Sequence, residues 1–200
     1  MKLKQLLVLI ILFAGIKTIP AQESGNLNSI FPSPVKGMYA EDAVAEKSQN
    51  MIMGLYLKDL SRYYYSKYGE HQLSVFIMPF DLETIQMINY LNKVAPDTLQ
   101  MYEELGYKLV NYKSHKGLTY AKEDNFAFIL IVDDKFGTVT IEGYSTGNNY
   151  DYISSIILQY LENLNITEIQ NYTSGQMENA RKSFQNLGSE LGKKLEEEGF

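Results

Sequence analysis

The side chains that most often carry out catalysis are scarce in this chain. Histidine occurs only at His71 and His115, and cysteine is absent. Both histidines fall where we expect turns, and a zinc site would need further ligands at a spacing such as His-x-x-x-His, which does not occur. Neither a P-loop nor a Gly-x-Gly-x-x-Gly run is present. We therefore predict no catalytic, metal-binding or cofactor-binding residues, and a protein that is not an enzyme.

Paired carboxylates offer one further kind of chemistry, acid–base catalysis or calcium binding. The tightest pair is Asp133-Asp134, and it lacks the spaced oxygen ligands of a calcium loop. A charged run that follows an apolar strand and ends in a glycine, here Gly137, is typical of a hairpin turn. We interpret the pair as turn residues.

Four tyrosines form the most unusual local composition, with Tyr63, Tyr64 and Tyr65 in sequence and Tyr68 close behind. A phenol ring has an apolar face and a polar tip, so such rings can stack on sugars or bases. Apolar residues recur at three- and four-residue steps over residues 42–68, which predicts a helix. Consecutive helical residues point about 100° apart. Tyr64 and Tyr68 can therefore share a side and are the candidate ligand-binding residues, with ordinary packing as the alternative.

The last residues of the chain form a second amphipathic pattern. Six apolar residues follow one another at steps of three or four residues, and they make a narrow seam on a polar helix. We call these residues the apolar seam: Met177, Ala180, Phe184, Leu187, Leu191 and Leu195. Such a stripe requires a partner. It packs on the chain's own domain, or it binds a protein partner or a second copy, in particular through Met177, Phe184, Leu187 and Leu191.

The amino terminus has the order of a secretory signal peptide. Lys2 and Lys4 precede an apolar run over residues 6–16, and Ala21 offers a small residue at the cleavage position. The run is shorter than the roughly 20 residues that a bilayer requires. We expect residues 1–21 to be removed and the protein to be exported, periplasmic or secreted, without a stable membrane span.

The net charge of the chain makes some classes of binding partner unfavourable. Three of the 18 basic side chains lie within residues 1–21, which leaves 15 against 24 acidic ones and a net charge of −9. An acidic protein of this kind is disfavoured on nucleic acid and on anionic lipid surfaces. We expect neither as a partner.

Residues 125–145 predict a hairpin on which the fold is built. An apolar run, Phe126 to Val132, is typical of a strand buried on both faces, and the alternating run after Gly137 is typical of a strand with one buried face. Further patterns predict a strand over residues 73–80, helices that begin near Leu82 and at Pro96, a hairpin over residues 107–121 and a helix over residues 150–164.

These elements predict an α+β fold, an antiparallel or mixed sheet of four to five strands with helices packed mainly on one face. A C-terminal amphipathic helix follows it. The expected organisation is a signal peptide (1–21), a flexible leader rich in Ser, Asn, Gly and Pro (22–41), the α+β domain (42–165) and the C-terminal helical extension (166–200).

Several stretches resemble an exported domain-of-unknown-function family of Bacteroidetes-type bacteria. They are the strand over residues 73–78, the run Glu104-Leu-Gly-Tyr-Lys-Leu-Val110, the hairpin from Phe128 to Asp134, the strand end Ile141-Glu-Gly143 and the Pro-Ala-Gln end of the leader. The resemblance covers about half of the chain. It implies export, and since the family carries no established activity it lends no catalytic residue.

Three functions remain open from the sequence. The first is a non-catalytic exported protein that acts by protein or envelope binding. The second is a small-ligand or glycan-binding module that uses Tyr64 and Tyr68. The third is a hydrolase whose catalytic residues are dispersed, because the members of a Ser-His-Asp arrangement need not be neighbours in sequence. The identity of the ligand or partner, the oligomeric state and the strand order do not follow from the sequence.

Overall fold

The computed structural model describes residues 27–52, 55–122, 125–133, 136–146 and 150–197. In chain order the elements are the 3-10 helix η1 (Leu27–Ile30), strands β1 (Met38–Ala40), β2 (Val44–Ile52), β3 (Leu55–Ser66) and β4 (His71–Met78), helices α2 (Leu82–Leu91) and α3 (Pro96–Glu104), strands β5 (Tyr107–Tyr112), β6 (His115–Lys122), β7 (Asn125–Asp133) and β8 (Gly137–Ser145), and helices α4 (Tyr150–Glu162) and α5 (Ile166–Glu197).

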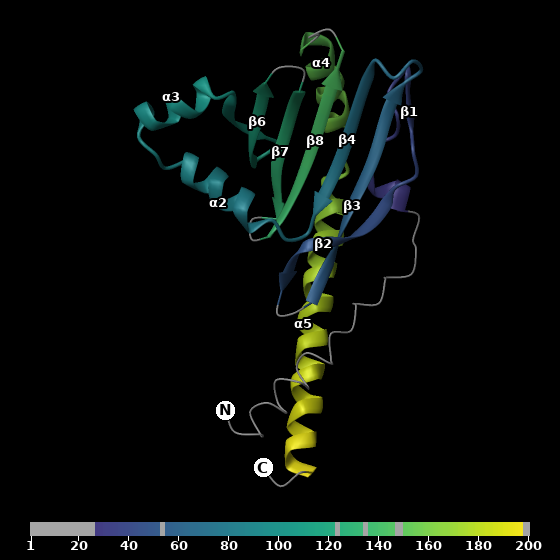
Figure 1. The fold of residues 1–200 in the computed structure, drawn as a ribbon, viewed down its shortest axis with the longest axis vertical. Coiled ribbons are helices and arrows are strands. Elements are labelled where there is room, and N and C mark those ends of the chain that lie inside the picture. Colours follow the sequence, from purple (N-terminus) through teal and green to yellow (C-terminus); the bar gives the residue numbers. More distant parts are fainter. Residues whose placement is uncertain (1–26, 53–54, 123–124, 134–135, 147–149, 198–200) are drawn as a thin grey trace.

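The strands form one eight-stranded sheet in which every recorded pair is antiparallel. Its order is β1-β3-β4-β8-β7-β6-β5, and β2 pairs with the same long strand, β3, as β1 does. The predicted hairpin of residues 125–145 is confirmed as β7 and β8, which lie near the middle of the sheet. Figure 1 shows α4 and α5 behind the sheet and α2 and α3 in front of it, at one side.

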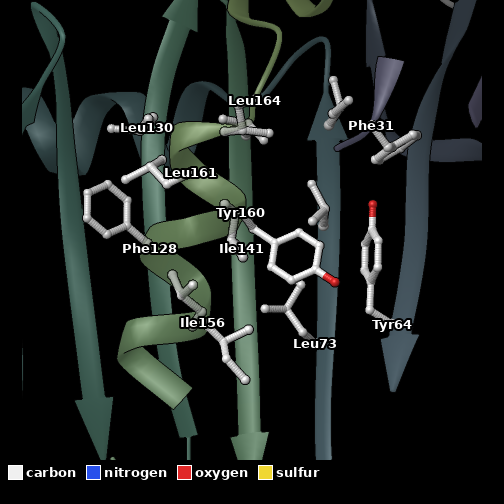
Figure 2. Close-up of a cluster of buried hydrophobic side chains, with 14 of the residues drawn as sticks. Phe31, Tyr64, Leu73, Phe128, Leu130, Ile141, Ile156, Tyr160, Leu161 and Leu164 are labelled. Atoms are coloured by element: carbon white, nitrogen blue, oxygen red, sulfur yellow. The ribbon is translucent and has the colours of Figure 1, made fainter. Parts of the chain in front are cut away.

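The main core lies between the sheet and α4. Alternate residues of β4 and β8 point to this side, among them Val75 and Ile141, and the apolar face of α4 covers them with Ile153, Ile157 and Tyr160. Figure 2 shows the cluster, with the Tyr160 ring beside Tyr64 of β3. Burying alternate residues of each strand is the reason why these strands are apolar at every second position.

Two tyrosines hold the N-terminal segment onto this core. The rings of Tyr64 and Tyr160 meet edge to face with centroids 4.5 Å apart. The Tyr64 hydroxyl donates to the carbonyl of Pro32 at 2.8 Å, and the amide of Val35 donates to the Tyr160 hydroxyl at 3.3 Å. Both buried hydroxyl groups therefore form a hydrogen bond with the backbone of the N-terminal segment. The described part of the expected flexible leader therefore packs in place, and its Phe31 is buried.

A second core lies on the opposite face, under α2. Asp81 caps this helix by accepting a hydrogen bond from the amide of Thr84 at 3.2 Å. A separate cluster joins three residues of α2 to β6 and β7: Ile85, Ile88, Leu91, Leu118 and Ile131. Helices therefore pack on both faces of the sheet.

The predicted fold class is wrong in two respects. The sheet has eight strands where four to five were expected, and α2 lies on the opposite face from α4. Most of the missing strands come from residues 42–68, where a helix was predicted and the structure has β2 and β3.

The physical reason lies in the irregular alternation of β3. Leu55, Leu57 and Leu60 are all buried, so the period of two is broken once and the spacing imitates a helix. Strand pairing on both sides of β3 supplies the hydrogen bonds that settle the conformation. The local spacing of apolar residues carries no information about β1, β2 and β4, the strands that pair with β3.

Packing of α4 on β8 gives a first test. A Cβ at Gly143 would lie 2.5 Å from Cγ1 of Ile153 and 2.9 Å from Cδ1 of Ile157. Gly143→Ala should therefore lower the free energy of unfolding by about 1–3 kcal/mol, measured by urea denaturation. The control is Gly175→Ala in α5, where no atom lies within 4 Å of the added Cβ and stability should be unchanged or raised by up to about 1 kcal/mol. An unchanged Gly143→Ala variant would contradict this packing.

Candidate functional site

On the face that carries α2, part of the sheet has no helix over it. Figure 1 shows β8, β4 and β3 open towards the viewer, with α2 and α3 displaced to the β5–β7 side. Two rows of side chains cross this open area at right angles to the strands. In register, the first row is Tyr39, Tyr65, Gln72, Tyr144, Asn125 and Lys122, and the second is Tyr63, Ser74, Glu142, Ala127, Tyr120 and Tyr107. We call these two rows the open tyrosine face.

Four tyrosines of this face are exposed, Tyr39, Tyr63, Tyr65 and Tyr144, while Tyr107 and Tyr120 are half-buried. The exposed fractions of Tyr63 and Tyr65 are 43% and 40%, which is high for large aromatic residues in a sheet. Contacts between rings hold them in place. Tyr65 stacks on Tyr39 with centroids 5.8 Å apart, and Tyr63 meets Phe76 edge to face at 6.1 Å. The rings are therefore both accessible and ordered, as a stacking surface requires.

A second group of rings borders the face on the α3 side. Tyr120 of β6 packs on Tyr107 of β5 with centroids 4.7 Å apart, and Tyr107 meets Tyr102 of α3 at 6.4 Å. Tyrosines thus stand on both sides of the central strands β4, β8 and β7. Apart from Tyr144 of β8, the residues between them are small or polar.

A shallow, open hollow of about 320 Å³ lies between these groups. Glu142 is one of its lining residues, and its neighbours in register are Ser74 and Ala127. Because these two side chains are short, the sheet surface is low on either side of the carboxylate. The lining residues are Gln72, Ser74, Tyr120, Asn125, Phe126, Ala127, Glu142, Gly143 and Tyr144.

The Glu142 carboxylate is the charged group of this hollow. Partial burial raises its pKa above the ordinary value of 4.5. Among the described residues no lysine, arginine or histidine forms an ion pair with it. The Glu142 side chain as a whole remains exposed, so its carboxylate is an accessible negative charge without a counter-charge among the described residues.

The structure separates the two tyrosines that the sequence analysis selected. Tyr64 is 1% exposed and belongs to the main core, so it cannot bind a ligand, whereas Tyr68 projects from the turn after β3 and is 78% exposed. On a strand, alternate residues share a face. The accessible pair is therefore Tyr63 and Tyr65, and a strand assignment of residues 55–66 would have identified it.

The histidines lie in strands, at the ends of β4 and β6, and each makes a hydrogen bond. Nδ1 of His71 lies 2.9 Å from Oγ of Ser145, and Nδ1 of His115 lies 3.0 Å from the carbonyl oxygen of Ile131. Residues 143–147 also fit the Gly-x-Ser-x-Gly pattern of serine hydrolases, which the sequence analysis did not use. Ser145 is only 1% exposed, and Tyr152 of α4 covers the His71 ring with centroids 4.2 Å apart. In this arrangement the serine does not reach a substrate.

A buried polar cluster lies where α5 crosses the sheet. Asp81 accepts a hydrogen bond from the Thr138 hydroxyl at 2.8 Å. Asp59 is close enough to Asp81 for their charges to interact, and burial is the main cause that raises its pKa to about 6. Gln176 of α5 is 4% exposed. Among the described residues, the buried oxygens Oδ1 of Asp59 and Oε1 of Gln176 have no hydrogen-bond partner.

The C-terminal helix divides into two halves. In the first, Met177 and Ala180 of the apolar seam pack on Leu57 of β3, and the Tyr172 hydroxyl donates to the carbonyl of Lys58 at 2.6 Å. Beyond Ala180 no described residue of α5 is buried, and Phe184 is 46% exposed. Figure 1 shows this outer half standing out from the sheet. The seam is thus partly core and partly free.

Two features are absent from the described residues. No group of three or more His, Cys, Asp or Glu side chains there is arranged to hold a metal ion. In the same part of the chain, no helix has both the length and the apolar character needed to cross a membrane.

Comparisons with known proteins give no family. No protein-family model and no curated protein sequence matches the chain. Among solved structures, the chain is similar to one from a study of an archaeal lipoylation system, a bi-partite lipoate protein ligase and its E2 lipoyl domain from Thermoplasma acidophilum, with 12% identity and a TM-score of 0.20. The match covers 65% of this chain and 62% of that chain. A likeness this low indicates neither a common fold nor a function.

The Asp59 carboxyl predicts a pH dependence of stability. Its pKa is about 6 in the folded chain against an ordinary 3.8, so between these values the folded state holds a proton that the unfolded state has lost. Stability should therefore fall as the pH rises from about 4 to about 6. Asp59→Asn should remove part of this fall, measured by urea denaturation at several pH values. Asp97→Asn, at an exposed position of α3, serves as the control and should follow the unmodified protein. Parallel curves for Asp59→Asn would contradict the assignment.

Proposed function

We propose that this chain is an exported, non-catalytic protein that binds a glycan of the cell envelope on the open tyrosine face. The observation that carries the proposal is the pair of exposed, ordered tyrosine rows around a hollow with a polar floor. Its ligand-binding residues are Tyr63, Tyr65 and Tyr144, together with Gln72 and Glu142.

The chemistry of a sugar matches the chemistry of this face. A pyranose ring has apolar C–H faces that stack on aromatic rings, while its hydroxyls require hydrogen-bonding partners at the edge. Tyr63 and Tyr144 offer rings, and Gln72 and Glu142 offer an amide and a carboxylate between them. Ordered rings beside a few polar groups are a usual composition for small-ligand sites.

The expectation of export supports this choice of ligand. Lys2 and Lys4, the apolar run over residues 6–16 and Ala21 are typical of a signal peptide, and the resemblance to an exported family agrees with them. An exported protein meets envelope glycans. The predicted charge of −9 after cleavage makes nucleic acid an unsuitable ligand for the same tyrosines.

Two substitutions on the face test the proposal. Tyr63→Ala and Tyr144→Ala should each weaken binding of the chain from Gln22 onward to soluble oligosaccharides by about three- to tenfold, because each removes a stacking ring. Binding would be measured by glycan array and then by calorimetry. Tyr90→Ala is the matched control, since Tyr90 is 55% exposed on α2, outside the two rows.

Retention of full binding by both face variants would refute the assignment of this face. Loss of binding in Tyr90→Ala as well would point to a general effect of removing tyrosine. Circular dichroism of each variant checks that the fold is kept, and partial exposure of both face tyrosines makes a folded variant the expected result.

Self-association through the outer half of α5 is a second candidate function. It is favoured by the exposed Phe184 and by the continuation of the apolar seam through Leu187, Leu191 and Leu195 into the half that stands free. If two copies pair there, sedimentation equilibrium of the chain from Gln22 should give the mass of two chains. Phe184→Ser with Leu191→Ser should give one, because burial of these side chains drives the pairing. Leu158→Ser, at an exposed position of α4, is the control. A monomeric unmodified chain would contradict self-association.

A further inference from the structure

We infer that the hollow around Glu142 receives a primary ammonium group, so that the glycan bound on the open tyrosine face is one that carries free amino sugars. This inference rests on the proposed function and names its ligand class. It is drawn from the position of Glu142, the size of its neighbours and the lack of a counter-charge among the described residues.

The first argument is the space above the carboxylate. Glu142 of β8 lies in register between Ser74 of β4 and Ala127 of β7. Both neighbours are short, and the hollow of about 320 Å³ has Glu142 in its lining. A group the size of an ammonium on a sugar carbon therefore has room to approach the carboxylate from solvent.

The second argument is the arrangement of rings around that space. Tyr63 and Tyr120 stand two strands away from Glu142 on either side, which is about 10 Å at the usual strand spacing. Tyr144 lies two residues along β8, on the same face, about 7 Å away. Rings at these distances can lean over a sugar whose substituent reaches Glu142. The negative faces of such rings also attract a cation.

The third argument is electrostatic. No basic side chain of the described residues is ion-paired with Glu142, and the basic residue in its two rows is Lys122, at the end of β6 beside Asn125. The other titratable groups of the two rows are the tyrosines. An entering ammonium would supply the counter-charge that this carboxylate lacks among the described residues. A neutral hydroxyl would supply only a hydrogen bond.

A metal ion is a poorer occupant of the same place. A calcium ion takes six to eight oxygen ligands, usually from several carboxylates. Glu142 is the single carboxylate among the residues that line the hollow. An organic cation needs one carboxylate and aromatic neighbours, and that set is present.

The experiment compares two oligosaccharides that differ only in N-acetylation, so that one carries ammonium groups and the other neutral amides. The probes are the β-1,4-linked tetramer of glucosamine and the same tetramer with every nitrogen acetylated, titrated calorimetrically into the chain from Gln22 onward at pH 6. The protein should bind the glucosamine tetramer about three- to fivefold more tightly, which is the contribution of one ion pair at an exposed position. Glu142→Gln should bring the two affinities to within about twofold of each other, because glutamine can still form a hydrogen bond but carries no charge.

Glu162→Gln is the matched control for general attraction between a cationic ligand and an acidic protein. Glu162 is exposed on α4, which covers the opposite face of the sheet, so this variant should keep the preference for glucosamine. If Glu162→Gln loses the preference as fully as Glu142→Gln, the effect is one of net charge and the ammonium site is refuted.

The outcomes separate this inference from the proposed function. Equal binding of both tetramers, each weakened by Tyr63→Ala, would overturn the ammonium site and keep a glycan site on the face. A preference for glucosamine that Glu142→Gln leaves intact would also overturn it. If neither tetramer nor any other oligosaccharide on the array binds, the proposed function and this inference fall together.

Discussion

The packing of α4 against one face of β4 and β8 is the constraint on which the rest of the structure depends. Ile153 and Ile157 lie so close to the sheet that Gly143 has no room for a side chain. This contact commits alternate residues of both strands, such as Val75 and Ile141, to the core. The residues between them must then point to the opposite face, whatever lies there. The open tyrosine face is the necessary complement of the α4 core.

Helix α2 covers only part of that opposite face, and the residue types of the strands change where its coverage ends. β7 is apolar on both faces because α4 covers one side of it and α2 the other, with Ile131 under α2 and Leu130 under α4. β4 and β8 have polar residues such as Ser74 and Glu142 on the α2 side, beyond the reach of that helix. A half-covered sheet therefore leaves a strip that must be compatible with water. On this strip the polar residues occur with exposed tyrosines. Exposing aromatic rings to water is unfavourable, and a clustered apolar surface of this kind is typical of a binding site.

The long strand β3 joins the core to this strip. Its Tyr64 faces the core and fixes the N-terminal segment through the carbonyl of Pro32, while Tyr63 and Tyr65 face out. Neighbouring tyrosines thus lie on opposite faces of the sheet, because successive side chains of a strand point in opposite directions. A helix would place Tyr64 and Tyr68 on the same side, as was predicted. In the structure Tyr64 is a buried ring, whereas Tyr68 is an exposed residue of the turn after β3. The predicted pairing of Tyr64 with Tyr68 failed because the period of the element was misjudged, and binding through tyrosines stays a prediction.

The sequence by itself determined the elements whose patterns are regular. The hairpin of β7 and β8, the capped start of α2 at Asp81 and the apolar face of α4 all follow from local spacing and turn residues. Only the tertiary structure decided that residues 44–52 and 55–66 are strands, the order of the strands and the division of α5 into two halves. These depend on partners far away in the chain: β4 beside β3, and Leu57 beneath Ala180. A break in the alternation of buried residues within β3 gives the same spacing as a helix. The neighbours of Glu142 come from other strands, so only the strand register shows which side chains surround its carboxylate.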